Sequence, residues 1–381
     1  MFQLDDEQQA ILEMVRDFAR ERIAPHAAAW DRGHHFPIDV LEAAGGLGMG
    51  AIYVPEEHGG AGLGRLDAVR VFEELSKACP TIAAYISIHN MVVWMIDAFG
   101  DDAQREDWLP RLAGMGELAS YCLTEPGAGS DAGSLTTRAR PTGDGGYEIT
   151  GTKQFISGAG AASCYLVMAR TADTGSHGIS AFLVDGASEG LSFGPPERKM
   201  GWNAQPTRQV VLNGVRVAAR DRLGSEGQGF PIAMKGLNGG RLNIGACSLG
   251  GGQAALDAAI AHVRDREAFG RPLIEQQSVL FRLADLETQL EAARTLLWRA
   301  AGALDDGDPD AVRWCAMAKR VATDAGFDVA NGALQLLGGY GYLAEYGIEK
   351  IVRDLRVHQI LEGSNEIMRL IVGRMIAERR H

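Results

Sequence analysis

The order of periodicities along the chain is the feature that most limits what it can fold into. From Asp5 to about Gly116, apolar residues recur at helical spacing. Between roughly Leu118 and Gly224, short runs such as "CYLVMAR", "GISAFLV" and "RQVVLNGVRV" are rich in β-branched and aromatic residues and are bounded by Gly, Pro, Ser and Asp, which is typical of antiparallel strands. From Phe230 onward, long helical patterns return. This order predicts an α+β protein.

The same order predicts three domains. We expect an α-helical domain over residues 1–117, a small β-barrel or sandwich over residues 118–226 and a domain of long helices over residues 227–381. Asp5 and Asp6 are candidate caps of the first helix. The stretch "DDGDPD" is expected to form a turn between two long helices, with Pro309 opening the second.

Composition and charge exclude several classes of protein. The chain is 46% hydrophobic and 23% charged, as globular proteins are, and it has no run of eighteen apolar residues, so we expect no membrane span. Its formal charge of −12 argues against a nucleic-acid partner. The start, "MFQLDDEQQAILEMVRDFARERIAP", is amphipathic and acidic, which favours a first helix over a targeting signal. Five cysteines without a CxxC pair and nine histidines without HExxH spacing predict a reducing compartment and no metal site.

Two stretches in the strand-rich region could contact a flat ligand. "YCLTEPGAGSDAGS" runs from Tyr121 to Ser134, and its Gly/Ser-rich turn leaves backbone N–H groups free to meet phosphate or carbonyl oxygens. In "KQFISGAG", Phe155 and Ser157 pair a ring with a hydroxyl, which suits stacking on a heteroaromatic ring. An ordinary loop, a core phenylalanine and a turn serine remain the alternatives.

Three helical stretches carry weaker signals. No GxGxxG or GxxxxGK[ST] motif occurs, so a dinucleotide would not bind in the Rossmann manner. In "LNGGRLNIG", Arg241 is expected near a helix N-terminus, where it could meet a ligand phosphate, although solvent or a carboxylate would satisfy it equally. "REAFGRPLIEQQ" and "QLLGGYGY" pair polar side chains with glycines or aromatics, and each could also be a helix end.

The stretch "HQILEGSNEIMR" contains the strongest candidate for chemistry. A helix is expected to begin near Ser364, capped by Ser364 or Asn365, so that Glu362 lies just before it. Behind Ile360 and Leu361, the carboxyl group could sit in a partly apolar pocket, where loss of water raises its pKa toward that of a general base. A capping or salt-bridged acid is the alternative.

Taken in this order, these stretches resemble the acyl-CoA dehydrogenase family over nearly the full chain. The resemblance is carried by "AYISIHNMVVWMIDAFG", "YCLTEPGAGSDAGSL", "GWNAQPTRQVVL", "GLNGGRLNI" and "RVHQILEGSNEIMRLIVGR". It implies an N-terminal α-helical domain, a middle β-barrel domain and a C-terminal four-helix bundle, assembled as a homotetramer with FAD between barrel and bundle. It also implies oxidation of a short branched-chain acyl-CoA, namely isobutyryl-CoA to methacrylyl-CoA in valine catabolism, with electrons passed to electron-transferring flavoprotein.

Carried over position by position, the resemblance implies two sets of contact residues. The FAD contacts would be Tyr121, Cys122, Leu123, Thr124, Gly129, Ser130, Phe155, Ile156 and Ser157 at the ring system, Arg266, Phe269, Gln276, Gln277, Gln335, Leu336, Gly338 and Gly339 from a neighbouring subunit, and Ser364, Asn365 and Glu366 toward the pyrophosphate and adenosine. The acyl-CoA contacts would be Ser130, Asn238, Gly239, Gly240, Arg241 and Arg374.

The resemblance also implies that Glu362 is the base that removes the α-proton, with its own backbone N–H as a donor to the thioester carbonyl. In some members the base comes from the helix that here carries "LNGGR", at the position of Gly240. Glycine cannot act as a base, so Glu362 is the candidate of the two. Phe155, Ile156 and Ser157 stand where many members have Trp-Ile-Thr, and because a ring and a hydroxyl remain, we expect flavin binding to survive.

Other functions on the same fold stay open from the sequence. They are an acyl-CoA oxidase, another short-chain dehydrogenase acting on 2-methylbutyryl- or butyryl-CoA, and an inactive subunit for acyl-CoA binding or assembly. The start of the chain fits a bacterial cytoplasm, or a mitochondrial matrix protein that has already been trimmed.

Overall fold

The N-terminal part of the chain is helical, as the sequence predicts. The structure is a computed structural model that describes residues 4–378, so the ends of the first and third predicted domains, residues 1–3 and 379–381, lie outside the described residues. The Asp5 carboxylate accepts a hydrogen bond from the Gln8 N–H at 2.8 Å and so caps the first helix, as expected. The helices are α1 (Asp6–Phe18), continued by a π-helical turn (Ala19–Ile23), α2 (Ala27–Gly33), α3 (Ile38–Gly45), α4 (Arg65–Ala78), α5 (Pro80–Phe99) and α6 (Asp102–Ala113).

The middle of the chain forms one eight-stranded sheet. Its strands are β1 (Ala119–Cys122), β2 (Arg138–Pro141), β3 (Tyr147–Ser157), β4 (Cys164–Arg170), β5 (Ile179–Asp185), β6 (Leu191–Phe193), β7 (Thr207–Val217) and β8 (Arg222–Leu223). They follow the order β6-β7-β3-β2-β4-β5-β8, with β1 beside β4. The expectation of purely antiparallel strands is wrong for two pairs, because β4 pairs in parallel with β1 and β2. Strand β4 is buried along almost its whole length, since other elements cover both of its faces.

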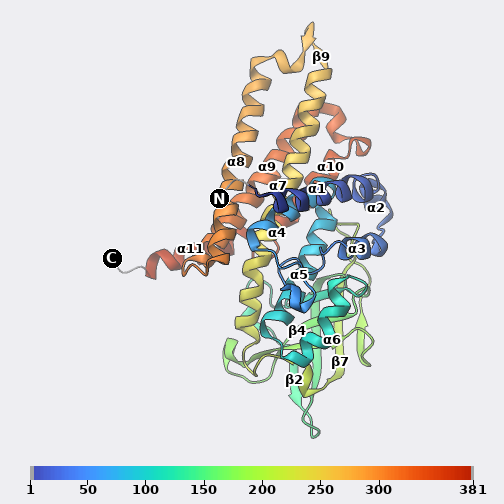
Figure 1. The fold of residues 1–381 in the computed structure, drawn as a ribbon, viewed down its shortest axis with the longest axis vertical. Helices are drawn as coiled ribbons and strands as arrows, with labels where there is room; N and C mark the ends of the chain where they lie inside the picture. The colour runs from blue at the N-terminus through green and yellow to red at the C-terminus, as the bar shows by residue number, and fades with distance from the viewer. Residues whose placement is uncertain (1–3, 379–381) are drawn as a thin grey trace.

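The C-terminal part consists of long helices that run beside one another (Figure 1). They are α7 (Gly229–Asp265), α8 (Gln277–Asp305), α9 (Ala311–Leu337), α10 (Ile348–Arg356) and α11 (Asn365–Glu378), with a hairpin of β9 (Glu267–Ala268) and β10 (Arg271–Pro272) joining α7 to α8. This hairpin lies at the opposite end of the molecule from the sheet, and α11 projects sideways from the bundle. The predicted turn between α8 and α9 is present, but Pro309 precedes α9 instead of opening it, since Asp310 is the cap.

Helix α7 runs through the middle of the molecule and contacts α4, α5, α8, α9 and β5. It approaches α4 and α9 closely because glycines stand at the crossings. A Cβ atom on Gly250 would lie 2.1 Å from the Glu73 carbonyl oxygen of α4, and one on Gly326 of α9 would lie 2.3 Å from the Ser248 carbonyl oxygen of α7. The backbones therefore pack directly on one another, and even a methyl group would push the helices apart.

Helix α5 is the most apolar helix of the described chain. By length and composition it is able to cross a membrane, although the sequence holds no unbroken apolar run of that length. In the fold, 72% of its most apolar 18-residue segment is buried inside the protein. Its polar residues are also used internally, since the amide of Asn90 bonds the Met49 carbonyl and the Ile52 N–H, at 2.7 and 2.8 Å. The apolar character of α5 is therefore explained by its place in the core.

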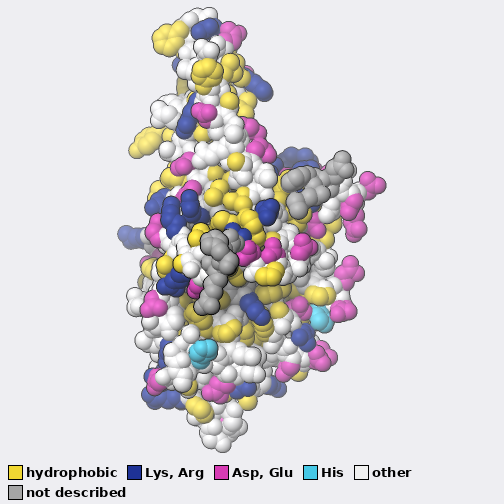
Figure 2. Space-filling view, turned by 90° about the vertical axis from the view of Figure 1, so that its left-hand side faces the viewer, with side chains coloured by type: hydrophobic (Ala, Val, Ile, Leu, Met, Phe, Trp, Pro, Cys, Tyr) yellow, Lys and Arg dark blue, Asp and Glu magenta, His cyan; other side chains and the backbone are white. Residues whose placement is uncertain are grey.

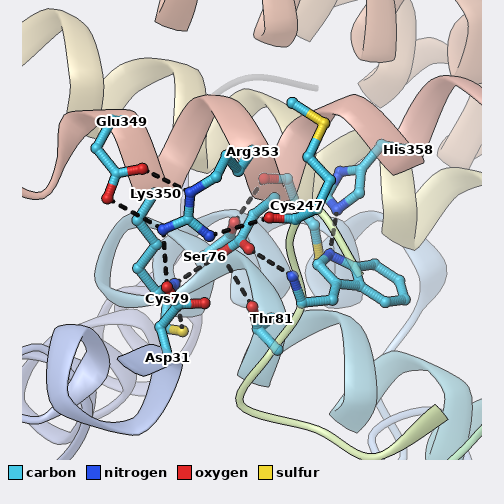
Figure 3. A network of polar contacts seen from close by, with 12 residues as sticks. Asp31, Ser76, Cys79, Thr81, Cys247, Glu349, Lys350, Arg353 and His358 are labelled. Carbon is cyan, nitrogen blue, oxygen red and sulfur yellow. Dashed lines mark hydrogen bonds and ion pairs between the residues drawn. The ribbon is translucent and has the colours of Figure 1, made fainter. Parts of the chain in front are cut away.

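Asp354 of α10 ties the three parts of the chain together through buried hydrogen bonds. Two of its partners, Thr81 and Lys350, are labelled in Figure 3. Its carboxylate accepts from the Trp202 backbone N–H at 2.7 Å, from the Thr81 hydroxyl of α5 at 2.9 Å and from the Lys350 ammonium at 2.6 Å. Burial lowers the pKa of Lys350, but attraction to Asp354 outweighs this and the net pKa is raised. Lys350 therefore stays charged, and the loop between β6 and β7, which carries Trp202, is fixed against α10.

Replacing Asp354 by Asn should destabilise the protein strongly. The change leaves Lys350 as an unpaired buried cation, and breaking a buried pair in this way costs about 3–5 kcal/mol. Asp17→Asn is the matched control, because Asp17 pairs with Arg20 at an exposed site, where solvent screens the pair and it contributes little to stability. Thermal unfolding of both variants at equal protein concentration measures the difference. Equal midpoints for the two variants would contradict the anchoring role of Asp354.

Candidate active site

A cavity of about 940 Å³ lies where the sheet, α5, α7 and the segment before α11 meet. Its size is that of a site for a small ligand or cofactor. Figure 2 looks onto the side from which α11 projects, and apolar side chains gather there between the bundle above and the sheet below. The lining residues that could hydrogen-bond or stack on a ligand include Tyr121, Thr124, Ser130, Phe155, Ser157, Arg241, Glu362 and Arg374.

The wall of the cavity that the sheet provides carries a ring bordered by hydroxyl groups. Phe155 is 64% exposed, and it lies in β3 where the register with β7 shifts between Lys153 and Ile156. Such a bulge re-aims a side chain, and Phe155 accordingly has a positive φ of 59°. The hydroxyl oxygen of Tyr121 is buried there without a hydrogen-bond partner among the described residues. A flat polar ligand would both cover Phe155 and supply this missing partner.

Glu362 belongs to a tight turn between α10 and α11. A 3₁₀ turn (Val357–Gln359) follows α10, and then Glu362 and Gly363 both adopt the left-handed conformation, with φ of 53° and 88°. Ser364 caps α11, since its hydroxyl oxygen accepts from the Ile367 N–H at 3.4 Å. Ser364 fills the capping role, and no ion pair of Glu362 occurs within residues 4–378. Neither a capping role nor a salt bridge of Glu362 is therefore supported.

The surroundings of Glu362 change its acidity. One carboxylate oxygen, Oε2, is shielded from solvent and has no hydrogen-bond partner among the described residues. The residue is accessible only in part, and it lines the cavity. Burial raises its pKa to about 7, although the positive charges of Lys319 and then Arg241 oppose the rise. A carboxyl group with a pKa near neutrality is suited to act as a general base.

Gly240 of α7 provides the space that the Glu362 carboxylate occupies. A Cβ atom on Gly240 would lie 2.2 Å from Glu362 Oε2. Any side chain at this position would therefore displace the carboxylate. Gly240 cannot itself act as a base, and its lack of a side chain leaves room for the Glu362 carboxylate.

Arg241 is not near a helix N-terminus, so this part of the sequence interpretation is wrong. Helix α7 begins at Gly229, which puts Arg241 about three turns inside the helix. Its side chain is buried and bonds the Asn238 side-chain oxygen at 2.8 Å and the Glu362 carbonyl oxygen at 3.3 Å. Arg241 still lines the cavity, but the dipole of the helix terminus cannot act there.

The cavity brings together only part of the predicted contact residues. Those that line it are Tyr121, Leu123, Thr124, Gly129, Ser130, Phe155, Ile156, Ser157, Arg241, Glu362 and Arg374. Those that are not among its lining residues are Cys122, Asn238, Gly239, Gly240, Arg266, Phe269, Gln276, Gln277, Gln335, Leu336, Gly338, Gly339, Ser364, Asn365 and Glu366. Phe269, which is 93% exposed, and Arg266 lie at the far hairpin (Figure 1). These two side chains therefore lie away from this chain's own cavity.

Four residues that no sequence pattern predicts as site residues support the Glu362 turn from behind. The indole N–H of Trp202 donates to His358 Nε2 at 3.1 Å, and His358 Nδ1 lies 2.7 Å from the Ser248 hydroxyl. Burial lowers the pKa of His358 to about 3, so the ring is neutral and its Nδ1–H donates to Ser248. Lys319, which bonds the Gly363 carbonyl, was missed as well. None of the four residues stands in a sequence pattern that marks it as a partner of this turn.

The fold agrees with the comparisons to known proteins. Three family descriptions match the chain: "Acyl-CoA dehydrogenase, N-terminal domain" over residues 5–116, "middle domain" over residues 120–215 and "C-terminal domain" over residues 227–377. The chain therefore belongs to the acyl-CoA dehydrogenase family and is an oxidoreductase.

Within this family, the chain is similar to several individual proteins. The chain is 51% identical to the mitochondrial isobutyryl-CoA dehydrogenase of Dictyostelium discoideum, over 99% of this chain and 91% of that protein. It is 48% identical to the mitochondrial isobutyryl-CoA dehydrogenase of Bos taurus, over 98% of this chain and 90% of that protein. The solved structure of butyryl-CoA dehydrogenase from Megasphaera elsdenii superposes with a TM-score of 0.97 at 37% identity, covering 99% of this chain and 100% of that chain.

Gly240→Ala should reduce activity without reducing stability. The new methyl group would push the flexible end of Glu362 aside, and a misplacement of about 1 Å can cost roughly 10²-fold in rate. Helix propensity favours Ala over Gly by about 1 kcal/mol, so the fold should not suffer. Turnover and thermal unfolding measured on the same preparation test this. Gly302→Ala is the control, because a Cβ atom there meets nothing within 4 Å. Wild-type turnover in Gly240→Ala would contradict the steric account.

Proposed function

We propose that this chain is an FAD-dependent dehydrogenase of a short branched-chain acyl-CoA, with isobutyryl-CoA as substrate and methacrylyl-CoA as product. The observation that carries the proposal is the Glu362 carboxyl group, which is enclosed in a cavity and has its pKa raised to about 7. The choice of isobutyryl-CoA is supported by two relatives of that name at 51% and 48% identity.

The residues on the sheet wall fit the ring system of FAD. Thr124 and Ser157 offer hydroxyl groups, Phe155 offers an exposed ring, and the unpartnered Tyr121 hydroxyl needs a hydrogen bond. These are the groups expected around a flat ligand with polar edges. When bound there, FAD would supply the acceptor for the hydride that leaves the β-carbon of the substrate.

Glu362 would take the proton from the α-carbon. The α-proton of a thioester is weakly acidic, so a base with a pKa near the working pH is more effective than an ordinary carboxylate. The unpartnered Oε2 leaves an oxygen free to accept that proton. The apolar lining around it, which includes Leu237 and Leu361, would keep water away from the reacting carbon.

The backbone beside the base offers a donor for the thioester carbonyl. No acceptor for the Glu362 N–H is found within residues 4–378, whereas the Leu361 N–H is already bonded to the Val357 carbonyl at 3.0 Å. As the proton leaves, negative charge develops on the carbonyl oxygen, and a fixed N–H lowers the energy of that state. The left-handed turn at Glu362 would thus provide both the base and a donor.

Residues at the bundle surface support an assembled enzyme. Arg266 and Phe269 at the hairpin are exposed and lie away from this chain's cavity, so in a homotetramer they could contact FAD held by a neighbouring subunit, together with Gln276, Gln277 and the 335–339 segment. Electron-transferring flavoprotein is the proposed acceptor of the electrons. The proposed compartment is a bacterial cytoplasm or a mitochondrial matrix.

Glu362→Gln should keep the yellow colour of bound flavin and lose nearly all turnover. The amide keeps the size of the side chain but cannot accept the α-proton, and loss of a general base costs about 10²–10⁴-fold. Steady-state rates with isobutyryl-CoA and the visible absorbance spectrum measure the two properties. Activity within a few-fold of the wild type would mean that another group removes the proton.

A substrate panel tests the choice of acyl chain and acceptor. We expect kcat/KM to be highest for isobutyryl-CoA among isobutyryl-, 2-methylbutyryl-, butyryl- and isovaleryl-CoA, by about tenfold, since one methylene in a fitted pocket is worth about 1–3 kcal/mol. Electron-transferring flavoprotein should be needed for turnover. Rapid turnover with oxygen alone and release of peroxide would point to an oxidase, and a colourless protein that does not take up FAD would point to an inactive subunit.

A further inference from the structure

Lys319 of α9 is a buried cation without a carboxylate partner. Its side chain has 0% exposure, and its ammonium group donates to the Gly363 carbonyl oxygen at 2.8 Å and to the Asn365 side-chain oxygen at 3.0 Å. No ion pair of Lys319 occurs within residues 4–378, unlike the buried Lys153 and Lys350, which pair with Glu125 and Asp354. A buried ammonium that bonds only neutral oxygens is costly, so its place calls for an explanation.

The two oxygens that Lys319 contacts both belong to the segment that carries Glu362. Gly363 follows Glu362 in the left-handed turn, and Asn365 begins α11. Asn365 is itself held by α9, since its amide donates to Thr323 at 3.0 Å and to Asp324 at 2.7 Å. Lys319 therefore fixes the far side of the turn, while Arg241 bonds the Glu362 carbonyl on the near side.

We propose that Lys319 is a positioning residue for the base, which holds the Glu362–Gly363 turn and supplies the positive potential that keeps the Glu362 carboxylate ionised and ready to accept a proton. This inference rests on the proposed function, in which Glu362 removes the α-proton. It assigns to α9 an electrostatic part in the reaction, in addition to its packing against α7.

The charges around Glu362 support this assignment. The positive charges of Lys319 and Arg241 both oppose the effect of burial on the pKa of Glu362, and the effect of Lys319 is the larger of the two. Burial also lowers the pKa of Lys319, to about 8, against the attraction of Glu362. At neutral pH most Lys319 side chains therefore remain protonated and attract the carboxylate.

Four buried titratable groups near this pair stay neutral in the working range. Burial raises the pKa of the Cys247 thiol of α7 and of the phenols of Tyr121 in β1 and Tyr53 in the loop before Glu56, all of which face Glu362. Burial lowers the pKa of His358 to about 3. These four groups therefore stay neutral. The acids that face Lys319 besides Glu362 are Asp324 and Glu366, whose side chains are 34% and 79% exposed and thus screened by solvent. Between pH 6 and 9, Glu362 and Lys319 are therefore the groups expected to titrate here.

The test compares Lys319→Gln with Lys319→Arg. Gln can still donate a hydrogen bond to Gly363 but carries no charge, whereas Arg keeps the charge. The pH profile of kcat/KM for isobutyryl-CoA should rise through pH 7 in the wild type, because Glu362 must lose its proton. In Lys319→Gln the rise should move about one unit to higher pH, which lowers kcat/KM roughly fivefold at pH 7 and little at pH 9. In Lys319→Arg it should stay within a few tenths of a unit of the wild type.

A uniform loss of activity in Lys319→Gln with an unmoved profile would overturn the proposal, since it would show a purely structural role. An equal shift in Lys319→Arg would overturn it too. If Lys319→Gln does not fold, the wild-type holoenzyme decides: the side-chain carboxyl carbon of Glu362, assigned in a ¹³C spectrum by its loss in Glu362→Gln, should respond to a second titration near pH 8. A single step would refute the coupling. Full activity of Glu362→Gln would instead reject the proposed base itself.

Discussion

The close packing of α7 against its neighbours is the constraint on which the rest of the structure depends. At Gly250 and Gly326 the helix backbones touch α4 and α9 with no space for a methyl group, and at Gly240 the same helix makes room for the Glu362 carboxylate. Each glycine inside a helix costs about 1 kcal/mol of helix propensity relative to alanine. Direct backbone packing offsets that cost through many small dispersion contacts. One helix thus forms both the middle of the core and a wall of the cavity.

The Glu362 turn is held from both ends. A non-glycine residue in the left-handed region costs about 1–3 kcal/mol and persists only where the surroundings fix it. On one side, α10 is anchored by Asp354, which bonds α5 and the loop between β6 and β7. On the other, Ser364 caps α11 and Lys319 bonds Gly363. The carboxylate is therefore kept in the cavity by contacts far from it in the sequence.

Local patterns predicted the elements better than their partners. Runs such as "CYLVMAR" and "GISAFLV" became β4 and β5 because apolar β-branched residues suit a buried sheet. The parallel pairing of β1 with β4 was missed, since pairing direction depends on how distant segments meet. The sequence also predicts Arg241 near a helix start, yet Gly239 and Gly240 lie inside α7, where close packing selects glycine.

The sequence by itself determined the order of helical, sheet and helical parts, the start of a helix near Ser364 and the presence of an acid just before it, because periodicity and capping are local properties. Only the tertiary structure decided that this acid is enclosed, that Gly240 faces it and that Lys319 stands behind it. Burial and charge act through space, so the acidity of Glu362 follows from residues brought together by α7 and α9.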